Sequence, residues 1–116
     1  MKRFLFLIVL AFVQLGFSQN KEKPITEVSQ INQETEVLVD VRTPEEYEAG
    51  HLDDALNINW FDEDFAEQFK KIDKKKTIYL YCRSGRRSGK ATHMLDSLGY
   101  KNVINLTGGY SAWKEK

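Results

Sequence analysis

Cysteine is nearly absent from this sequence: one residue, Cys82, occurs among 116. An intramolecular disulfide and a zinc site built from several thiolates are therefore excluded, and two separated histidines add no credible metal set. Excess charge of either sign is also missing, because 17 basic side chains balance 17 acidic ones. That balance argues against a strongly basic nucleic-acid binder. We expect neither a bound metal nor a nucleic-acid partner.

Internal repeats and low-complexity stretches are absent too. Hydrophobic residues make up 41% and charged residues 29% of the chain, the balance of a globular protein rather than a disordered one. A chain of this length has room for one small domain.

Long apolar runs are confined to the amino-terminal end. Lys2 and Arg3 precede an apolar run over residues 4–17, and Gly16 and Ser18 form the small-x-small pattern that a signal peptidase reads. At about 1.5 Å per residue this run makes roughly 21 Å of helix, short of the roughly 30 Å hydrocarbon core of a bilayer. An uncleaved membrane anchor is the alternative, and the length argues against it.

These features predict three parts of the chain. We expect residues 1–18 to be a signal peptide, cleaved near Ser18, that exports the protein to the periplasm and leaves no membrane span behind. Residues 19–36 are then a polar leader with the first element of the domain. A single domain fills residues 37–116, or starts as early as residue 24.

Short β-branched runs predict strands. Residues 37–41 and 77–81 are nearly continuous in apolar or aromatic side chains, which favours strands covered on both faces, as in a parallel sheet. Residues 55–58 and 103–106 are shorter runs of the same kind. The segments between the runs carry helix signals, so the alternation predicts an α/β domain with a mainly parallel sheet.

Capping residues and apolar stripes mark the helices. Thr43 and Glu46 form a capping box with Pro44 at the first helical position, and Gly50 can end that helix. Stripes at helical spacing predict further helices, with Gly99 as a stop signal. The stripe residues are Phe61, Phe65, Phe69 and Ile72 in one helix, Ala91, Met94, Leu95 and Leu98 in the next, and Tyr110 and Trp113 in the last. We interpret the stripes as core faces.

Residues 82–88 carry the chemistry, because they begin where the second buried strand ends and finish where a helix begins. Ligands bind at the carboxyl ends of parallel strands, and a helix amino terminus offers unpaired N–H groups and the positive end of its dipole. Here Cys82 is followed by Arg83, Ser84, Gly85, Arg86, Arg87 and Ser88. Arginines and close backbone amides favour the thiolate, so we expect a lowered pKa for Cys82.

Each of these features alone has a plain structural explanation. A lone cysteine at a strand end is usually a small buried hydrophobe, and a group of arginines is commonly a solvated surface. Their coincidence at one strand-to-helix turn favours the reactive interpretation.

The run from Cys82 to Ser88 resembles the active-site loop of rhodanese-type sulfurtransferases of the single-domain bacterial kind. Two other stretches resemble the signatures of that family. They are Asp40-Val41-Arg42, Glu46-Tyr47, Gly50-His51-Leu52 and residues 55–58 on the amino-terminal side, and residues 106–110 with Ala112 and Trp113 on the carboxyl-terminal side. One departure is Asp54, where the family usually has glycine. Aspartate tolerates turn conformations, so we expect an effect on the local turn and not on activity.

The resemblance implies both a fold and a set of site residues. The fold is a five-stranded parallel sheet flanked by helices, and Cys82 is the nucleophile that carries sulfur. Loop amides cradle the sulfur and arginines receive the anionic donor. The implied substrate-binding residues are Arg83, Ser84, Gly85, Arg86, Arg87 and Ser88. Asp40 and Arg42 are scaffold contacts beside the pocket, and Arg42 can also pair with Glu46, four residues on.

Loop length separates sulfur chemistry from phosphate chemistry. Phosphatases that use cysteine place an arginine six residues after it, so that the loop spans a tetrahedral oxyanion. Here that position is Ser88, and the nearest arginine, Arg87, stands one residue earlier. The smaller loop suits a single sulfur atom on the cysteine.

These observations predict a thiosulfate sulfurtransferase that works by two-step nucleophilic catalysis through a Cys82 persulfide. Its partners are a small anionic sulfur donor and a thiol or cyanide acceptor, and no cofactor is required. Two alternatives stay open: a non-catalytic rhodanese-like binding module, and an exported redox-active thiol protein. The latter would need mixed disulfides with a partner, since the chain has no resolving cysteine.

Overall fold

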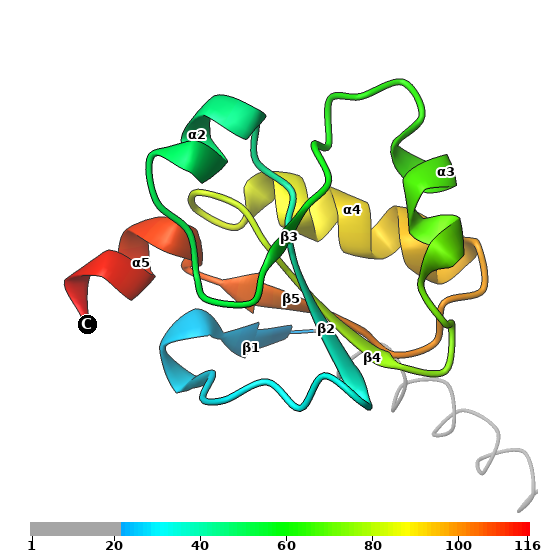
Figure 1. Ribbon diagram of the computed structural model, residues 1–116, viewed down its shortest axis with the longest axis horizontal. Coiled ribbons are helices and arrows are strands. Elements are labelled where there is room, and N and C mark those ends of the chain that lie inside the picture. Colours follow the sequence, from blue (N-terminus) through cyan, green and yellow to red (C-terminus); the bar gives the residue numbers. More distant parts are fainter. Residues whose placement is uncertain (1–21) are drawn as a thin grey trace, which may run out of the picture.

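Five parallel strands form one sheet in the order β1-β5-β4-β2-β3 (Figure 1). The computed structural model describes residues 22–116, so the predicted signal peptide and its cleavage position lie outside the described residues. The strands are β1 (Glu22–Pro24), β2 (Glu36–Asp40), β3 (Leu56–Asn57), β4 (Thr77–Tyr81) and β5 (Val103–Thr107). The two strongly apolar runs, β2 and β4, pair with each other inside the sheet, as their composition predicted.

Helices pack on both faces of the sheet. They are the 3-10 turn η2 (Ile25–Glu27), α2 (Pro44–Glu48), α3 (Phe65–Gln68) with the 3-10 turn η3 (Phe69–Lys71), α4 (Arg86–Ser97) and α5 (Gly109–Glu115). Successive residues of a strand point to opposite faces. In β4, Ile78 and Leu80 therefore pack in the core formed with α3, η3 and α4, whereas Tyr81 packs in the core formed with η2 and α5.

The capping box predicted at the start of α2 is confirmed. The Thr43 hydroxyl accepts a hydrogen bond from the Glu46 N–H at 3.2 Å, and the Glu46 carboxylate accepts one from the Thr43 N–H at 2.9 Å. Pro44 occupies the first helical position. The cap stabilises the start of this five-residue helix. Glu46 can therefore reach Arg87 in the first turn of α4.

The first predicted apolar stripe does not form one helix. Phe61 lies before α3 and is 65% exposed, while Phe65 and Phe69 are buried. The reason is local: the Asn59 side chain accepts a hydrogen bond from the Phe61 N–H, which gives the backbone an alternative to the helix.

The second predicted stripe is shifted on α4. Met94 and Leu98 are partly exposed, at 36% and 47%, and the buried residues are Ser88, Ala91, Thr92 and Leu95. The first two turns of α4 thus bury two hydroxyl groups: Ser88 lies beside the Cys82 sulfur, and Thr92 donates to the Ser88 carbonyl.

The turn at Asp54 and the edge strand β1 depart from the usual sequence patterns of a turn and of a strand. Asp54 has a φ of 70°, the left-handed conformation for which glycine is usual and which aspartate tolerates. The short strand β1 has no apolar pattern of its own and forms by pairing with β5 at the sheet edge. The resemblance had implied its existence as a fifth strand.

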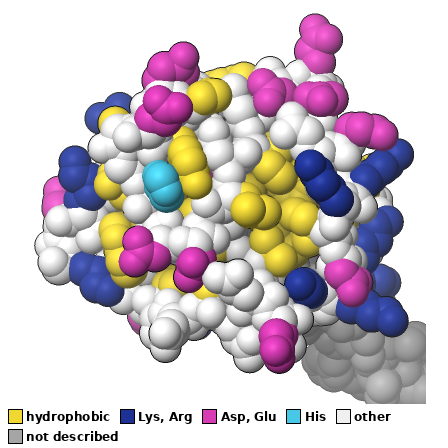
Figure 2. All heavy atoms as spheres, viewed as in Figure 1, with side chains coloured by type: hydrophobic (Ala, Val, Ile, Leu, Met, Phe, Trp, Pro, Cys, Tyr) yellow, Lys and Arg dark blue, Asp and Glu magenta, His cyan; other side chains and the backbone are white. Residues whose placement is uncertain are grey.

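Hydrophobic side chains also gather on the outer face near β3 and α3 (Figure 2). Leu56 of β3 is half exposed there and lines a shallow hollow with Ile58 and Ile72. Within residues 22–116, no helix is long and apolar enough to cross a bilayer.

Candidate active site

Cys82 directly follows β4 and is 1% exposed. Its Sγ accepts a hydrogen bond from the Gly85 N–H at 3.0 Å and lies 3.4 Å from the Ser88 hydroxyl. The N–H groups of Ser84 and Ser88 also act on the sulfur. The loop between β4 and α4 therefore turns its amides inward around one sulfur atom.

Helix α5 fixes the shape of this loop by binding the first two of its carbonyls. The N–H of Tyr110 donates to the Cys82 carbonyl at 2.8 Å, and the N–H of Ser111 donates to the Arg83 carbonyl at 3.0 Å. Gly109 permits this approach, because a Cβ there would clash with the Arg83 carbonyl. With the carbonyls held by α5, and with Gly85 at a φ of 111° as the N-cap of α4, the next amides face the sulfur.

The environment lowers the pKa of the Cys82 thiol. Burial alone would raise it, but hydrogen bonds from the Ser88 side chain and from loop amides outweigh burial and favour the thiolate. The direction agrees with the sequence-based expectation, although the main cause differs. Hydrogen bonds to the sulfur dominate, and the arginines are not among the principal contributions.

Ser88 is fully buried and links the sulfur to β5. Its hydroxyl lies 2.6 Å from the Oδ1 of Asn105, whose Nδ2 donates a long hydrogen bond of 3.4 Å to the Gly85 carbonyl. Ser88 is among the predicted substrate-binding residues, whereas Asn105 is not. Asn105 lies in a strand, and nothing in the local sequence indicates that it contacts a loop 20 residues earlier.

Arg87 forms a two-pronged ion pair with Glu46. Its Nη1 lies 2.8 Å from Oε1, and its Nη2 lies 3.0 Å from Oε2. Hydrogen bonding from Arg87, with further help from Thr43 and against the effect of burial, lowers the pKa of Glu46 to about 2. The pair joins α2 to the first turn of α4 beside the loop.

The predicted pair between Arg42 and Glu46 is wrong. Arg42 instead holds the buried carboxylate of Asp40 through Nε and Nη2, with a shortest distance of 2.7 Å, and donates to the Gly50 carbonyl. Its guanidinium stacks on the Tyr110 ring with 4.3 Å to the centroid. Asp40 is the nearer carboxylate and is completely buried, so it needs this partner.

Arg83 and Arg86 are exposed, and neither side chain has a hydrogen bond or ion pair with any residue of the described part of the chain. Of the three loop arginines, these two are free to meet an anion, whereas Arg87 is occupied by Glu46. Over residues 22–116, no group of three histidine, cysteine, aspartate or glutamate side chains could hold a metal ion.

Comparisons with known proteins agree with this geometry. The family model described as "Rhodanese-like domain" matches residues 25–116. A sulfurtransferase of Allochromatium vinosum is 40% identical over 77 residues, which cover 66% of this chain and 70% of that protein. The thiosulfate sulfurtransferase PspE of Escherichia coli is 37% identical over 70 residues, covering 60% of this chain and 67% of PspE.

Solved structures are similar as well. The crystal structure of a rhodanese-related protein from Thermoplasma volcanium matches with a TM-score of 0.63 and 30% identity, covering 72% of this chain and 81% of that one. Coverage is smaller for some relatives: the matched region spans 64% and 61% of the length of curated proteins from Schizosaccharomyces pombe and Bacillus subtilis.

Proposed function

The chain belongs to the rhodanese-like domain family, and from that premise we propose that it transfers sulfane sulfur from thiosulfate or a similar donor to a thiophilic acceptor through a persulfide on Cys82. The observation that carries the proposal is the set of hydrogen bonds around Cys82 Sγ, which lower the pKa of the thiol without any neighbouring base. A thiolate prepared in this way is a nucleophile for sulfur.

In the first step the Cys82 thiolate attacks the outer sulfur of thiosulfate. The bond between the two thiosulfate sulfurs breaks, and sulfite leaves with the electron pair. Arg83 and Arg86 are the exposed cations that receive the dianionic donor. The amides that favour the thiolate also surround the new persulfide, whose outer sulfur carries the charge.

In the second step an acceptor thiolate or cyanide attacks the outer sulfur of the persulfide. The sulfur–sulfur bond breaks, and Cys82 returns as a thiolate. Because the same amides stabilise that leaving thiolate, the loop assists both steps.

The position six residues after Cys82 supports sulfur chemistry over phosphate chemistry. Ser88 stands there, buried and held by Asn105, where a cysteine phosphatase would need an arginine that faces its substrate. Arg87, one residue earlier, points to Glu46 instead. At the position where a phosphatase has its arginine, this loop therefore offers a buried hydroxyl and no guanidinium.

Steady-state sulfur transfer tests the proposal. We expect the protein to form thiocyanate from thiosulfate and cyanide, and Cys82→Ser to abolish the activity without loss of the fold, since serine is similar in size but a far weaker nucleophile without a base. Equal activity of the serine variant would refute the role of Cys82.

We also propose that residues 1–18 are a signal peptide and that the protein works in the periplasm. The basic start, the apolar run and the small residues Gly16 and Ser18 support this proposal. Amino-terminal sequencing of the protein from its native host should begin near Gln19. An intact Met1 on a cytoplasmic form would contradict export.

A further inference from the structure

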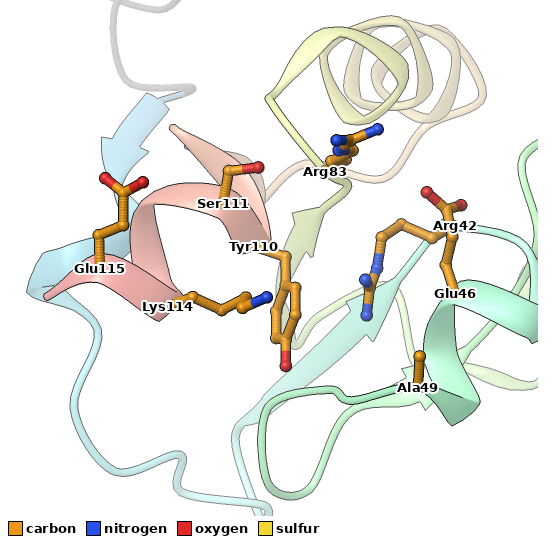
Figure 3. A pocket seen from close by; sticks show the side chains of 8 residues that line it. All are labelled: Arg42, Glu46, Ala49, Arg83, Tyr110, Ser111, Lys114 and Glu115. Atoms are coloured by element: carbon orange, nitrogen blue, oxygen red, sulfur yellow. The ribbon is translucent and has the colours of Figure 1, made fainter.

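A cavity of about 470 Å³ lies beside the Cys82 loop, between α2 and α5 (Figure 3). Arg83 of the loop, Glu46 and Ala49 at α2, and Ser111 and Lys114 of α5 contribute to its wall. The cavity is far larger than thiosulfate or cyanide needs, and its volume is in the range of sites for small organic molecules. The proposed sulfur transfer leaves it without an assigned ligand.

The cavity is lined by the buried guanidinium of Arg42, one nitrogen of which is not used within the described part of the chain. Arg42 is only 4% exposed, and Asp40 and Gly50 occupy its Nε and Nη2. Its Nη1 has no hydrogen-bond partner among residues 22–116, although every fully buried side-chain nitrogen and oxygen in that part of the chain has one. Since Arg42 lines the cavity, its Nη1 is reached from there.

Two more cations surround this nitrogen. The Lys114 amine lies 5.7 Å from the centroid of the Tyr110 ring, against which the Arg42 guanidinium also stacks (Figure 3). Arg83 stands on the wall nearest the loop. Two of the charges that line the cavity are already paired, Glu46 with Arg87 and Arg42 with Asp40. The remaining cations of the lining, Arg83 and Lys114, face one carboxylate, that of Glu115. The cavity thus favours an anion, and guanidinium groups match a carboxylate best.

The cavity adjoins the Cys82 loop at Arg83, the one loop residue in its lining. Arg83 follows Cys82 directly, and its carbonyl is held by the Ser111 N–H, while Glu46 holds Arg87 at the other end of the loop. A molecule bound between α2 and α5 therefore lies next to the loop that carries the persulfide.

The geometry points to this cavity as the acceptor site, where a small organic thiol is held by its carboxylate. The inference rests on the proposed sulfur transfer and names the substrate class of its second step. The thiolate of the bound acceptor attacks the outer persulfide sulfur, the bond to Cys82 Sγ breaks, and Cys82 leaves as a thiolate. The acceptor departs as a persulfide, so the step is balanced without an oxidant or a reductant.

A matched pair of acceptors tests the inference. Sulfur transfer from thiosulfate is measured to 3-mercaptopropionate and to 3-mercaptopropanol, which differ in the carboxylate and hardly in length. We expect kcat/KM for the carboxylate to exceed that for the alcohol, by about two- to fivefold for each cation engaged. Equal constants for the two thiols would overturn the inference.

A matched pair of variants locates the effect. Ala49 lines the cavity from the end of α2 and is exposed. Ala49→Glu should reduce the preference for 3-mercaptopropionate by raising its KM. Ala49→Gln has a side chain of the same size without the charge, so it should reduce this preference less. Lys114→Gln should also reduce the preference. The exposed Lys90 of α4 lies outside the cavity lining. Lys90→Gln is therefore the control and should keep the preference for 3-mercaptopropionate.

Failure of this inference is distinct from failure of the proposed function. If thiosulfate adds no sulfur to Cys82, sulfur transfer itself is refuted. If the persulfide forms and cyanide removes it, but Ala49→Glu and Ala49→Gln show the same ratio of the two thiols, only the acceptor site is refuted.

Discussion

The hydroxyl of Ser88 lies 2.6 Å from the Oδ1 of Asn105, and its single proton is also within reach of the Cys82 sulfur at 3.4 Å. The Asn105 Nδ2 faces the Gly85 carbonyl, so Oδ1 is the atom turned toward Ser88. Two acceptors compete for one proton. A proton given to Asn105 is unavailable to the thiolate, and the pair therefore sets how strongly Ser88 stabilises the charged sulfur.

Substitution of the two partners should move the pKa of Cys82 in opposite directions. Ser88→Ala removes a hydrogen-bond donor to the sulfur and should raise the pKa of Cys82. Asn105→Ala frees the Ser88 proton for the sulfur and should lower the pKa of Cys82. The pH dependence of alkylation by a neutral reagent measures both. The double variant should behave like Ser88→Ala, and shifts of the same sign in the two single variants would contradict the competition.

The ion pair between Glu46 and Arg87 should stabilise the fold in a pH-dependent way. The pKa of Glu46 is lowered to about 2 from an ordinary 4.5, so its contribution is complete above about pH 4.5 and is lost as the pH falls toward 2. Because both side chains are partly solvated, we expect Glu46→Gln to cost about 1–2 kcal/mol at neutral pH.

Urea unfolding at pH 7 and at pH 3 measures this effect. The difference in stability between the natural protein and Glu46→Gln should shrink at the lower pH. Glu45→Gln on the exposed side of α2 is the control and should change little. A constant difference across this range would contradict the role of the pair.

Arg86 should act on the donor and hardly on stability. It is exposed and without a partner among the described residues, and the family resemblance implies that the loop arginines receive the anionic donor. Charge-assisted contacts are worth about 1.5–3 kcal/mol, so Arg86→Ala should reduce kcat/KM for thiosulfate by about 10- to 150-fold. Lys90→Ala, one turn further along α4, is the control. If kcat/KM for thiosulfate is unchanged in Arg86→Ala, Arg86 does not bind the donor and Arg83 is the remaining candidate.

Local signals predicted the elements that carry them. The apolar runs of β2 and β4, the capping box at Thr43 and the strand-to-helix turn at Cys82 each depend on neighbours in sequence, and each is present. The helix after the turn starts earlier than expected, at Arg86, so Arg86, Arg87 and Ser88 belong to the first turn of α4. The helix predicted from Phe61 does not form, because the Phe61 N–H donates to the Asn59 side chain and the backbone turns there instead.

Contacts between segments far apart in the chain could not be predicted from local sequence patterns. Asn105 and Ser111 act on the Cys82 loop from β5 and α5, and neither residue type marks such a contact. Arg42 had two carboxylates within reach, and spacing alone favoured Glu46. Burial of Asp40, which only the assembled sheet reveals, decides the pairing.

Sulfur storage on Cys82 is tested most directly by the mass of the intact protein after incubation with thiosulfate. We predict a gain of one sulfur atom, located on Cys82, that cyanide removes as thiocyanate and that Cys82→Ser never acquires. A protein that gains no sulfur and instead hydrolyses aryl phosphates rapidly would contradict the assignment of this loop to sulfur.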